Sequence, residues 1–189
     1  MIYLIRHAEK ENSSVHAKLT KKGLESSFIY GKNLKKSNIK LTKIITSPIE
    51  RCLQTSQKIA EAYKNIIIEE SSLLGNPGIF VNDGDLAMDI FNQYKLIDII
   101  NMQLSNQELE GFNDIKNASN QLLNLMKTNK DNTLYISHDA IISPFIFFIK
   151  NRKRIVQNEI VNYLDGYSCN KNNSLNLWSP YSMSNLIKK

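Results

Sequence analysis

Two short segments, far apart in the sequence, each place a histidine directly after a run of apolar residues. Residues 2–5 are followed by Arg6 and His7, and a second apolar run is followed by His138 and Asp139. Such runs are typical of buried β-strands, and open α/β sheets bind ligands at the carboxyl ends of their strands. An imidazole beside a guanidinium suits a phosphate group, because the guanidinium offers a planar fork of donors and the imidazole can attack or donate a proton.

Arg51 supplies a second guanidinium. It lies in the first turn of a helix that we expect to begin at Ser47, because Ser47 suits the cap, Pro48 suits the first helical position and Glu50 would close a capping box. This helix follows another short apolar segment, residues 43–46. If the strands are neighbours, two imidazoles, two guanidiniums and the N–H groups of a helix start face one small volume. The pattern therefore predicts a site for a dianionic tetrahedral group.

Strands and helices are expected to alternate along most of the chain. The expected strands cover residues 2–5, 43–46, 66–68 and 133–137, with further candidates at 160–163 and 174–178, and the expected helices cover residues 20–36, 48–63, 86–101, 112–126 and 140–149. Alternation of this kind predicts an α/β fold, a three-layer α/β/α sandwich with a mostly parallel central sheet. A chain of 189 residues is also long enough for one domain with a substantial core, spanning residues 1–189.

The net charge of +6 favours anionic partners, but the lysines are spread among polar residues and no nucleic-acid-binding module is present. The most apolar run, residues 141–149, is too short to span a membrane. The first strand begins at Ile2, so a cleaved secretory signal would remove Arg6 and His7 with it. We therefore expect a cytoplasmic protein with no membrane and no nucleic-acid partner.

These segments resemble the histidine phosphatase superfamily, also called the phosphoglycerate mutase-like family. The matching segments are residues 4–9, Leu19-Thr20 with Gly23, residues 46–55 and residues 136–138. The Ser-Pro-x-x-Arg-x-x-Gln-Thr element within residues 46–55 is the most specific of them. Ala8 stands where the family usually has glycine, a change that is tolerated unless the backbone there needs glycine-only angles.

The resemblance implies phosphoryl transfer through a phosphohistidine. His7 would be the nucleophile, and Arg6, Arg51 and His138 would bind the phosphoryl oxygens and offset their charge. The implied substrate is a small phosphorylated compound or a phosphoprotein. Neither a metal nor a cofactor is needed, and no ligand spacing in the sequence indicates one.

The general acid is the least determined part of the site. Many family members use a glutamate after the third strand, where Glu69 and Glu70 lie, while Asp83 and Asp85 come somewhat later. Another branch, the acid phosphatases and phytases, uses the aspartate directly after its second histidine, which here is Asp139. We therefore expect Asp139 to be the acid, with Glu70 as the second candidate, although an aspartate at this position could instead only cap the following helix.

Three other side chains have alternative or structural interpretations. Arg51 could pair with Glu50 or Gln54 on the helix surface instead of facing a ligand. His16 has no motif support and is expected in a loop, and Tyr163 is expected to be a packing group.

The resemblance leaves more than one function open. The chain is shorter than typical mutases of the family, with a modest segment between its third strand and second histidine, which favours a phosphatase. A phosphoglycerate mutase-type phosphotransferase is the alternative enzyme, and a weakly catalytic phosphate-binding regulatory domain is the alternative from another class. The physiological substrate and the oligomeric state are not indicated by the sequence.

Overall fold

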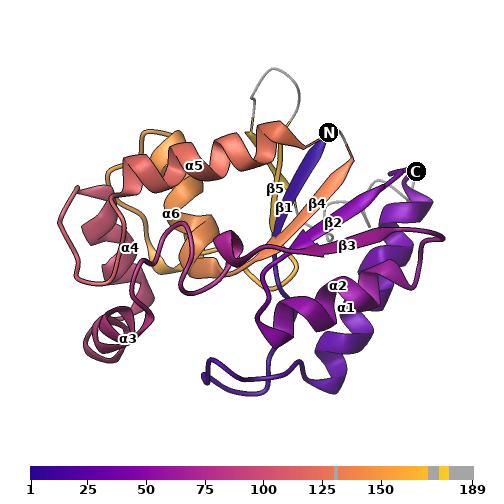
Figure 1. Cartoon of the computed structure of the whole chain (residues 1–189), viewed down its shortest axis with the longest axis horizontal. Helices are drawn as coiled ribbons and strands as arrows, with labels where there is room; N and C mark the ends of the chain where they lie inside the picture. The colour runs from indigo at the N-terminus through magenta and orange to yellow at the C-terminus, as the bar shows by residue number, and fades with distance from the viewer. Residues whose placement is uncertain (130–131, 170–174, 179–189) are drawn as a thin grey trace. The chain divides into compact units, whose positions relative to one another are not determined.

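The computed structural model describes residues 1–129, 132–169 and 175–178 (Figure 1). For Cys169 and residues 175–178 only the backbone is described. Within these ranges a six-stranded sheet has the order β3-β2-β4-β1-β5-β6. The strands are β1 (Ile2–Arg6), β2 (Lys43–Thr46), β3 (Ile67–Glu70), β4 (Thr133–Ser137), β5 (Gly166–Cys169) and β6 (Leu175–Trp178). The helices are α1 (Lys21–Lys36), α2 (Glu50–Ala60), α3 (Gly84–Gln93), α4 (Leu96–Leu104), α5 (Ile115–Thr128) and α6 (Asp139–Ile149), with short 3₁₀ turns at Ser72–Leu74 and Gln157–Glu159. The expected α/β class, a central sheet flanked by helices, is confirmed.

The chain divides into two compact units. The sheet unit comprises Met1–Ser71, the β4 segment and the residues from Asn162 onward, and the helical unit comprises Ser72–Asn129 and His138–Val161. The sheet unit therefore contains all six strands with α1 and α2, and the helical unit contains α3 to α6.

The sheet brings the carboxyl ends of four strands to one edge. Strands β3, β2, β4 and β1 run parallel, while β5 and β6 are antiparallel to their neighbours. In register, Arg6 at the end of β1 lies beside Ser137 of β4, and Thr46 of β2 lies beside Ile136. The prediction that these strands are neighbours is confirmed.

The last part of the sheet differs from the sequence-based expectation. Residues 160–163 do not form a strand, and β5 lies at Gly166–Cys169 instead. A Cβ at Gly166 would overlap the carbonyl oxygen of Leu4, so this strand needs glycine to approach β1 closely. A short segment that begins with glycine gives little periodic signal, which is why the pattern did not predict it. The expected strand near residues 174–178 is confirmed as β6.

The core of the sheet unit lies between the sheet and its two helices. Ile5, Ile44 and Ile136 of the strands pack in one buried cluster with Leu34 of α1 and Ile59 of α2. The opposite face of the central strands is buried as well, as Leu4 and Tyr135 are both 0% exposed. Burial on both faces explains why these strands read as continuous apolar runs rather than as alternating ones.

The two helix starts of the sheet unit gave different outcomes. Thr20 caps α1 as predicted, because its hydroxyl accepts the N–H of Gly23 at 2.9 Å. The predicted capping box at Ser47 is wrong: α2 begins at Glu50, and Ile49 is its cap without a side-chain bond. The N–H of Ser47 still donates to Ile136 O across the sheet at 3.0 Å. This bond keeps Ser47 beside β4, one residue beyond the end of β2, and the helix begins three residues later, at Glu50.

The helical unit contains one more helix than expected. The pattern predicts a single helix over residues 86–101, but Tyr94 is extended (φ −126°, ψ 149°) and separates α3 from α4. Apolar spacing continues across this break without glycine or proline, so periodicity alone cannot show it. Helix α6 contains Pro144, as expected, and contacts both α4 and α5. Among the described residues, no helix has the length and apolarity that crossing a bilayer requires.

Candidate active site

The main chain fixes Arg6 and His7 at the end of β1. The N–H of Arg6 donates to Asp165 O and the N–H of His7 donates to Ser137 O, both at 3.0 Å. His7 is only 1% exposed. The sheet therefore holds the histidine rigidly at its carboxyl edge, as the sequence predicts.

The hydrogen bonds of the His7 ring define its tautomer. Nδ1 lies 2.7 Å from the carbonyl oxygen of Ala8, which can only accept, so Nδ1 carries the proton. Nε2 accepts a hydrogen bond from Nε of Arg51 at 3.1 Å, so Nε2 carries the lone pair. A neutral imidazole with its lone pair on Nε2 is the form that can act as a nucleophile.

The surroundings of His7 keep the ring neutral. The pKa of His7 is lowered to about 3, and burial is the largest cause. The hydrogen bond to Ala8 acts in the opposite direction, and the positive charges of Arg51, Arg6 and Lys10 contribute to the lowering. Two of these cations, Arg6 and Arg51, are also the groups expected to bind phosphate. The positive charge that suits an anionic ligand therefore also keeps the proton off the histidine.

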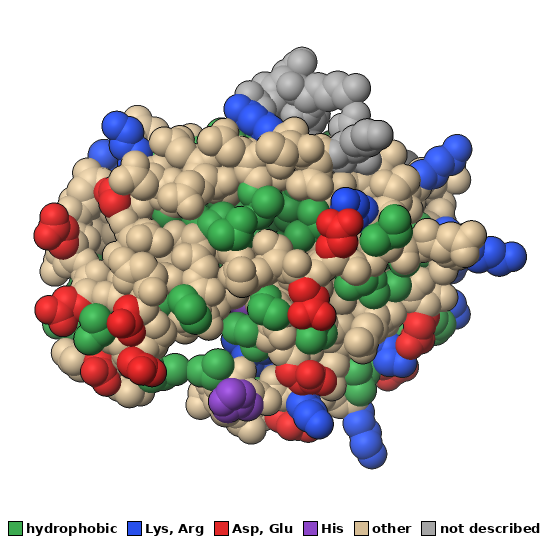
Figure 2. All heavy atoms as spheres, viewed as in Figure 1, with side chains coloured by type: hydrophobic (Ala, Val, Ile, Leu, Met, Phe, Trp, Pro, Cys, Tyr) green, Lys and Arg blue, Asp and Glu red, His purple; other side chains and the backbone are tan. Residues whose placement is uncertain are grey.

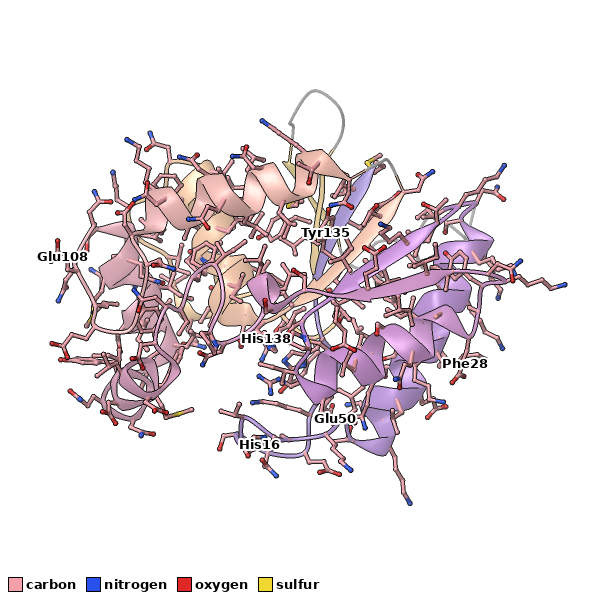
Figure 3. The ribbon with its side chains drawn as sticks, viewed as in Figure 1. His16, Phe28, Glu50, Glu108, Tyr135 and His138 are labelled. Atoms are coloured by element: carbon pink, nitrogen blue, oxygen red, sulfur yellow. The ribbon has the colours of Figure 1, made fainter. Side chains whose placement is uncertain are left out.

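Arg51 is buried in the first turn of α2, with 8% of its surface exposed. Besides its bond to His7, it donates from Nη1 to the carbonyl oxygen of Val15 at 2.6 Å. Glu50, labelled in Figure 3, is exposed at the start of the same helix. Arg51 thus faces His7 as predicted, rather than lying on the helix surface.

Two further residues of α2 hold the loop that follows β1. Thr55 Oγ1 accepts the N–H of Ala8 at 3.1 Å and donates to Arg51 O at 2.7 Å, and Gln54 Oε1 accepts the N–H of Leu19 at 2.8 Å. Both residues belong to the Ser-Pro-x-x-Arg-x-x-Gln-Thr element, but the sequence pattern does not show that they bind this loop. Ala8 itself is absent from the residues with positive φ, so alanine fits where the family usually has glycine.

Tyr163 is the residue of this site that sequence reasoning missed. The guanidinium carbon of Arg6 lies 4.2 Å from the centroid of the Tyr163 ring, and the ring centroid of His7 lies 5.7 Å from it. The sequence gives no signal for this contact, because Tyr163 follows a 3₁₀ turn in a segment with no motif.

His138 and Asp139 belong to the helical unit. His138 is 6% exposed and caps α6, where its carbonyl oxygen accepts the N–H groups of Ile141 and Ile142. It is joined directly to Ser137, the last residue of β4 (Figure 3). Asp139 is the first residue of α6, and its Oδ1 accepts the N–H of Ala140 at 3.0 Å.

The other carboxylates proposed as acids differ in their surroundings. Glu69 pairs with Lys43 at 2.8 Å. Glu70 is exposed and ends β3 at the carboxyl edge of the sheet, in register with Thr46. In the helical unit, Asp83 caps α3 by accepting the N–H groups of Asp85 and Leu86, and Asp85 is exposed in the first turn. A capping role therefore accounts for Asp83, and an ion pair for Glu69.

The third histidine and many other charged side chains lie on the surface of the described part of the chain. His16 is exposed in the loop after β1, as expected (Figure 3). On the face drawn in Figure 2, lysine and arginine side chains stand singly rather than in one continuous patch. Across residues 1–129, 132–169 and 175–178, no three His, Cys, Asp or Glu side chains converge as metal ligands would.

Comparison with known proteins gives one family match. Residues 2–79 match the model of the histidine phosphatase superfamily (branch 1). This range contains Arg6, His7 and Arg51, and also Glu69 and Glu70. No curated protein sequence matches the chain.

Solved structures share the fold over most of the chain. A mutant phosphoserine phosphatase from Entamoeba histolytica, in complex with phosphoserine, is 19% identical with a TM-score of 0.61, covering 94% of this chain and 94% of that one. A mycobacterial glucosyl-3-phosphoglycerate phosphatase with inorganic phosphate is 13% identical with a TM-score of 0.60, covering 94% and 95%. The protein histidine phosphatase SixA, complexed with tungstate, is 14% identical with a TM-score of 0.56, covering 96% and 98%. At these identities the likeness concerns the fold. The family match itself concerns residues 2–79 of this chain.

Proposed function

We propose that the chain is a metal-independent phosphatase that hydrolyses phosphate esters or related phosphorylated compounds through a phosphohistidine on His7. The observation that carries the proposal is the hydrogen bonding of the His7 ring, which puts the proton on Nδ1 and the lone pair on Nε2. The substrate would be a small phosphorylated compound or a phosphoprotein, and no cofactor takes part.

In the first step, Nε2 of His7 attacks phosphorus and forms the N–P bond while the ester P–O bond breaks. The incoming phosphoryl group would displace the hydrogen bond between His7 and Arg51, so that Arg6 and Arg51 donate to its oxygens. His138 would be a third group that binds these oxygens. It directly follows Ser137, the last residue of β4, and the carbonyl oxygen of Ser137 accepts the N–H of His7. In the second step, a water oxygen bonds to phosphorus while the N–P bond breaks, the water gives a proton to the carboxylate that protonated the leaving oxygen, and phosphate leaves.

Two carboxylates are candidates to protonate the leaving oxygen. Asp139 follows His138, as in one branch of the superfamily. Glu70 ends β3 at the carboxyl edge of the sheet. It lies within the residues that the branch 1 family model matches, whereas Asp139 lies outside them. The structural roles of Glu69 and Asp83 make these two weaker candidates.

The first experiment measures turnover of p-nitrophenyl phosphate with a chelator present. Wild-type protein is expected to release phosphate steadily, and His7→Ala to abolish release, because the nucleophile is gone. The exposed loop variant His16→Ala is the matched control and should retain wild-type activity. The proposal is contradicted if His7→Ala is as active as the wild type, or if only metal restores turnover.

The same assay addresses the two alternatives. Isomerisation of phosphoglycerates without release of phosphate would favour a mutase. Binding of inorganic phosphate with no turnover of monoesters, acyl phosphates or phosphohistidine would favour a regulatory domain.

A second experiment assigns the acid by comparing alkyl with aryl phosphates in Asp139→Asn and Glu70→Gln. Loss of the acid should slow alkyl phosphates by about 10²–10⁴-fold and aryl phosphates far less, since an aryl oxygen leaves without a proton. Glu108→Gln, which changes an exposed carboxylate of the helical unit, is the control. Equal slowing of both substrate classes would rule out that residue as the acid.

A further inference from the structure

We propose that Tyr163 is a positioning residue for Arg6. The ring of Tyr163 fixes the orientation in which the Arg6 guanidinium binds a phosphoryl group. The inference rests on the proposed function, because it assigns a further residue to the same reaction.

The geometry separates the two kinds of contact that Arg6 can make. Its guanidinium carbon lies 4.2 Å from the centroid of the Tyr163 ring, within the range of a cation–π contact. Arginine commonly stacks the face of its planar guanidinium on an aromatic ring in contacts of this kind. The N–H donors lie in the guanidinium plane, so they can still be directed at the oxygens of an anion. The ring therefore orients Arg6 without competing for its donors.

The segment that carries Tyr163 is attached to Arg6 itself. The N–H of Leu164 donates to Arg6 O at 3.2 Å, and the N–H of Arg6 donates to Asp165 O at 3.0 Å. A turn closes the segment, since the N–H of Asp165 donates to Asn162 O at 3.1 Å. The main chain thus ties the position of the ring to the residue on which the ring stacks.

This turn contains a strained residue. Leu164 has φ +59°, in the left-handed region that a bulky side chain rarely adopts. Its side chain is 7% exposed within the core cluster, which holds the strained backbone in place. Backbone strain of this kind concentrates at functional sites. Here it turns the chain so that Leu164 enters the core and Tyr163 faces Arg6.

Core packing does not account for Tyr163. Unlike Leu164, it is only partly buried and lies outside the core cluster. It borders a hollow of about 620 Å³ together with Asn33, Asn162 and Asp165. Its described ring contacts are with Arg6 and His7. The position therefore fits a role in the site better than the packing role expected from the sequence.

The test compares Tyr163→Phe with Tyr163→Leu, each in the wild-type and Arg6→Ala backgrounds. The readouts are kcat and KM for p-nitrophenyl phosphate and calorimetric binding of inorganic phosphate. Tyr163→Leu should lower kcat/KM and weaken phosphate binding by about 10-fold, whereas Tyr163→Phe keeps the ring and should stay within about 2-fold of wild type. In the Arg6→Ala background, Tyr163→Leu should weaken phosphate binding no further.

Tyr94→Leu, at a tyrosine that is 42% exposed in the helical unit, is the matched control and should behave as wild type. If Tyr163→Leu lowers the melting temperature strongly, Tyr163→Met replaces it, since methionine also lacks the aromatic face. The inference is overturned if the ring-deleting variant matches wild type, if Tyr163→Phe is as damaging, or if the loss is undiminished without Arg6. An inactive wild type would instead contradict the proposed function, and the phosphate-binding cycle would still test the coupling of Tyr163 to Arg6.

Discussion

At the scale of single residues, one imidazole combines two opposing requirements. A nucleophilic histidine must hold a lone pair near neutral pH, yet it must lie where an anion binds, which calls for positive charge. In this site Arg51 meets both requirements, because it donates to Nε2 of His7 and its charge disfavours protonation of the ring. An arriving phosphoryl group would exchange one partner of Arg51 for another without bringing a new cation into the site.

The low pKa of His7 gives a prediction about stability. Burial, the largest cause, lowers the pKa to about 3 in the folded protein from 6.5. Between these values the unfolded chain binds more protons than the folded one, so the free energy of unfolding should fall as pH falls through this window. From pH 7 to about pH 4.5 the loss due to His7 should be on the order of 2–3 kcal/mol.

Urea denaturation of wild type and His7→Gln at both pH values measures this loss of unfolding free energy. Subtracting the change found in His7→Gln from that of the wild type removes the contribution of the other titrating groups. Nitrogen-15 NMR of the ring should show Nδ1 protonated and Nε2 bare down to about pH 4. A His7 ring that titrates near 6.5 would contradict the prediction.

At the scale of elements, the N-terminal part of α2 supplies several of the side chains that hold the site together. Arg51, Gln54 and Thr55 lie within little more than one turn and reach His7 and the loop after β1. The helix must therefore stay fixed against α1 and the sheet for these contacts to keep their geometry. The two helices approach each other closely at Gly31, where an added Cβ would lie 2.5 Å from Ile59 O.

Gly31→Ala should consequently destabilise the protein by about 1–3 kcal/mol, because the helices must separate to admit the methyl group. It should also lower activity, since α2 carries Arg51. Gly84→Ala is the control: its Cβ would meet only side-chain atoms, the nearest being Asn76 Oδ1 at 3.2 Å. Denaturation midpoints measure the difference, and equal stability of the two variants would contradict this account of the helix contact.

The sequence predicts those parts of the site that local patterns determine. Arg6 and His7 follow a continuous apolar run, and Thr20 caps α1. Both features are predictable because buried strands and helix caps favour particular residue types at neighbouring positions. The start of α2 was predicted too early, because the bond from Ser47 to Ile136 joins residues far apart in the chain. Tyr163 was missed for the same reason, since its partner Arg6 lies near the other end of the sequence. What local patterns cannot show is which distant backbone a residue will meet.

At the scale of the whole molecule, charge favours the capture of anions. The chain carries 24 lysines and arginines against 18 aspartates and glutamates. Chain-wide excess charge of this kind raises the rate of encounter with an oppositely charged ligand. The expectation of a single domain over residues 1–189 stays a prediction, as do the cytoplasmic location and the absence of nucleic-acid partners.

Salt should therefore lower kcat/KM for a dianionic monoester while leaving kcat nearly unchanged. Raising ionic strength from about 0.01 to 0.15 M shortens the screening length from about 30 to 8 Å, and a loss of several-fold is expected. Titration with sodium chloride at constant pH measures it. A parallel fall in kcat would show that salt acts on the chemical step, not on encounter.

Three hydrogen bonds join main-chain atoms of the loop after β1 to side chains of α2: they involve the N–H of Ala8, the carbonyl oxygen of Val15 and the N–H of Leu19. Because these bonds use backbone atoms, which all residues share, the side chains between the bonded residues can be exchanged while the hydrogen bonds remain. The same scaffold could thus be given a new selectivity by transplanting residues 11–14, with the reacting groups left in place.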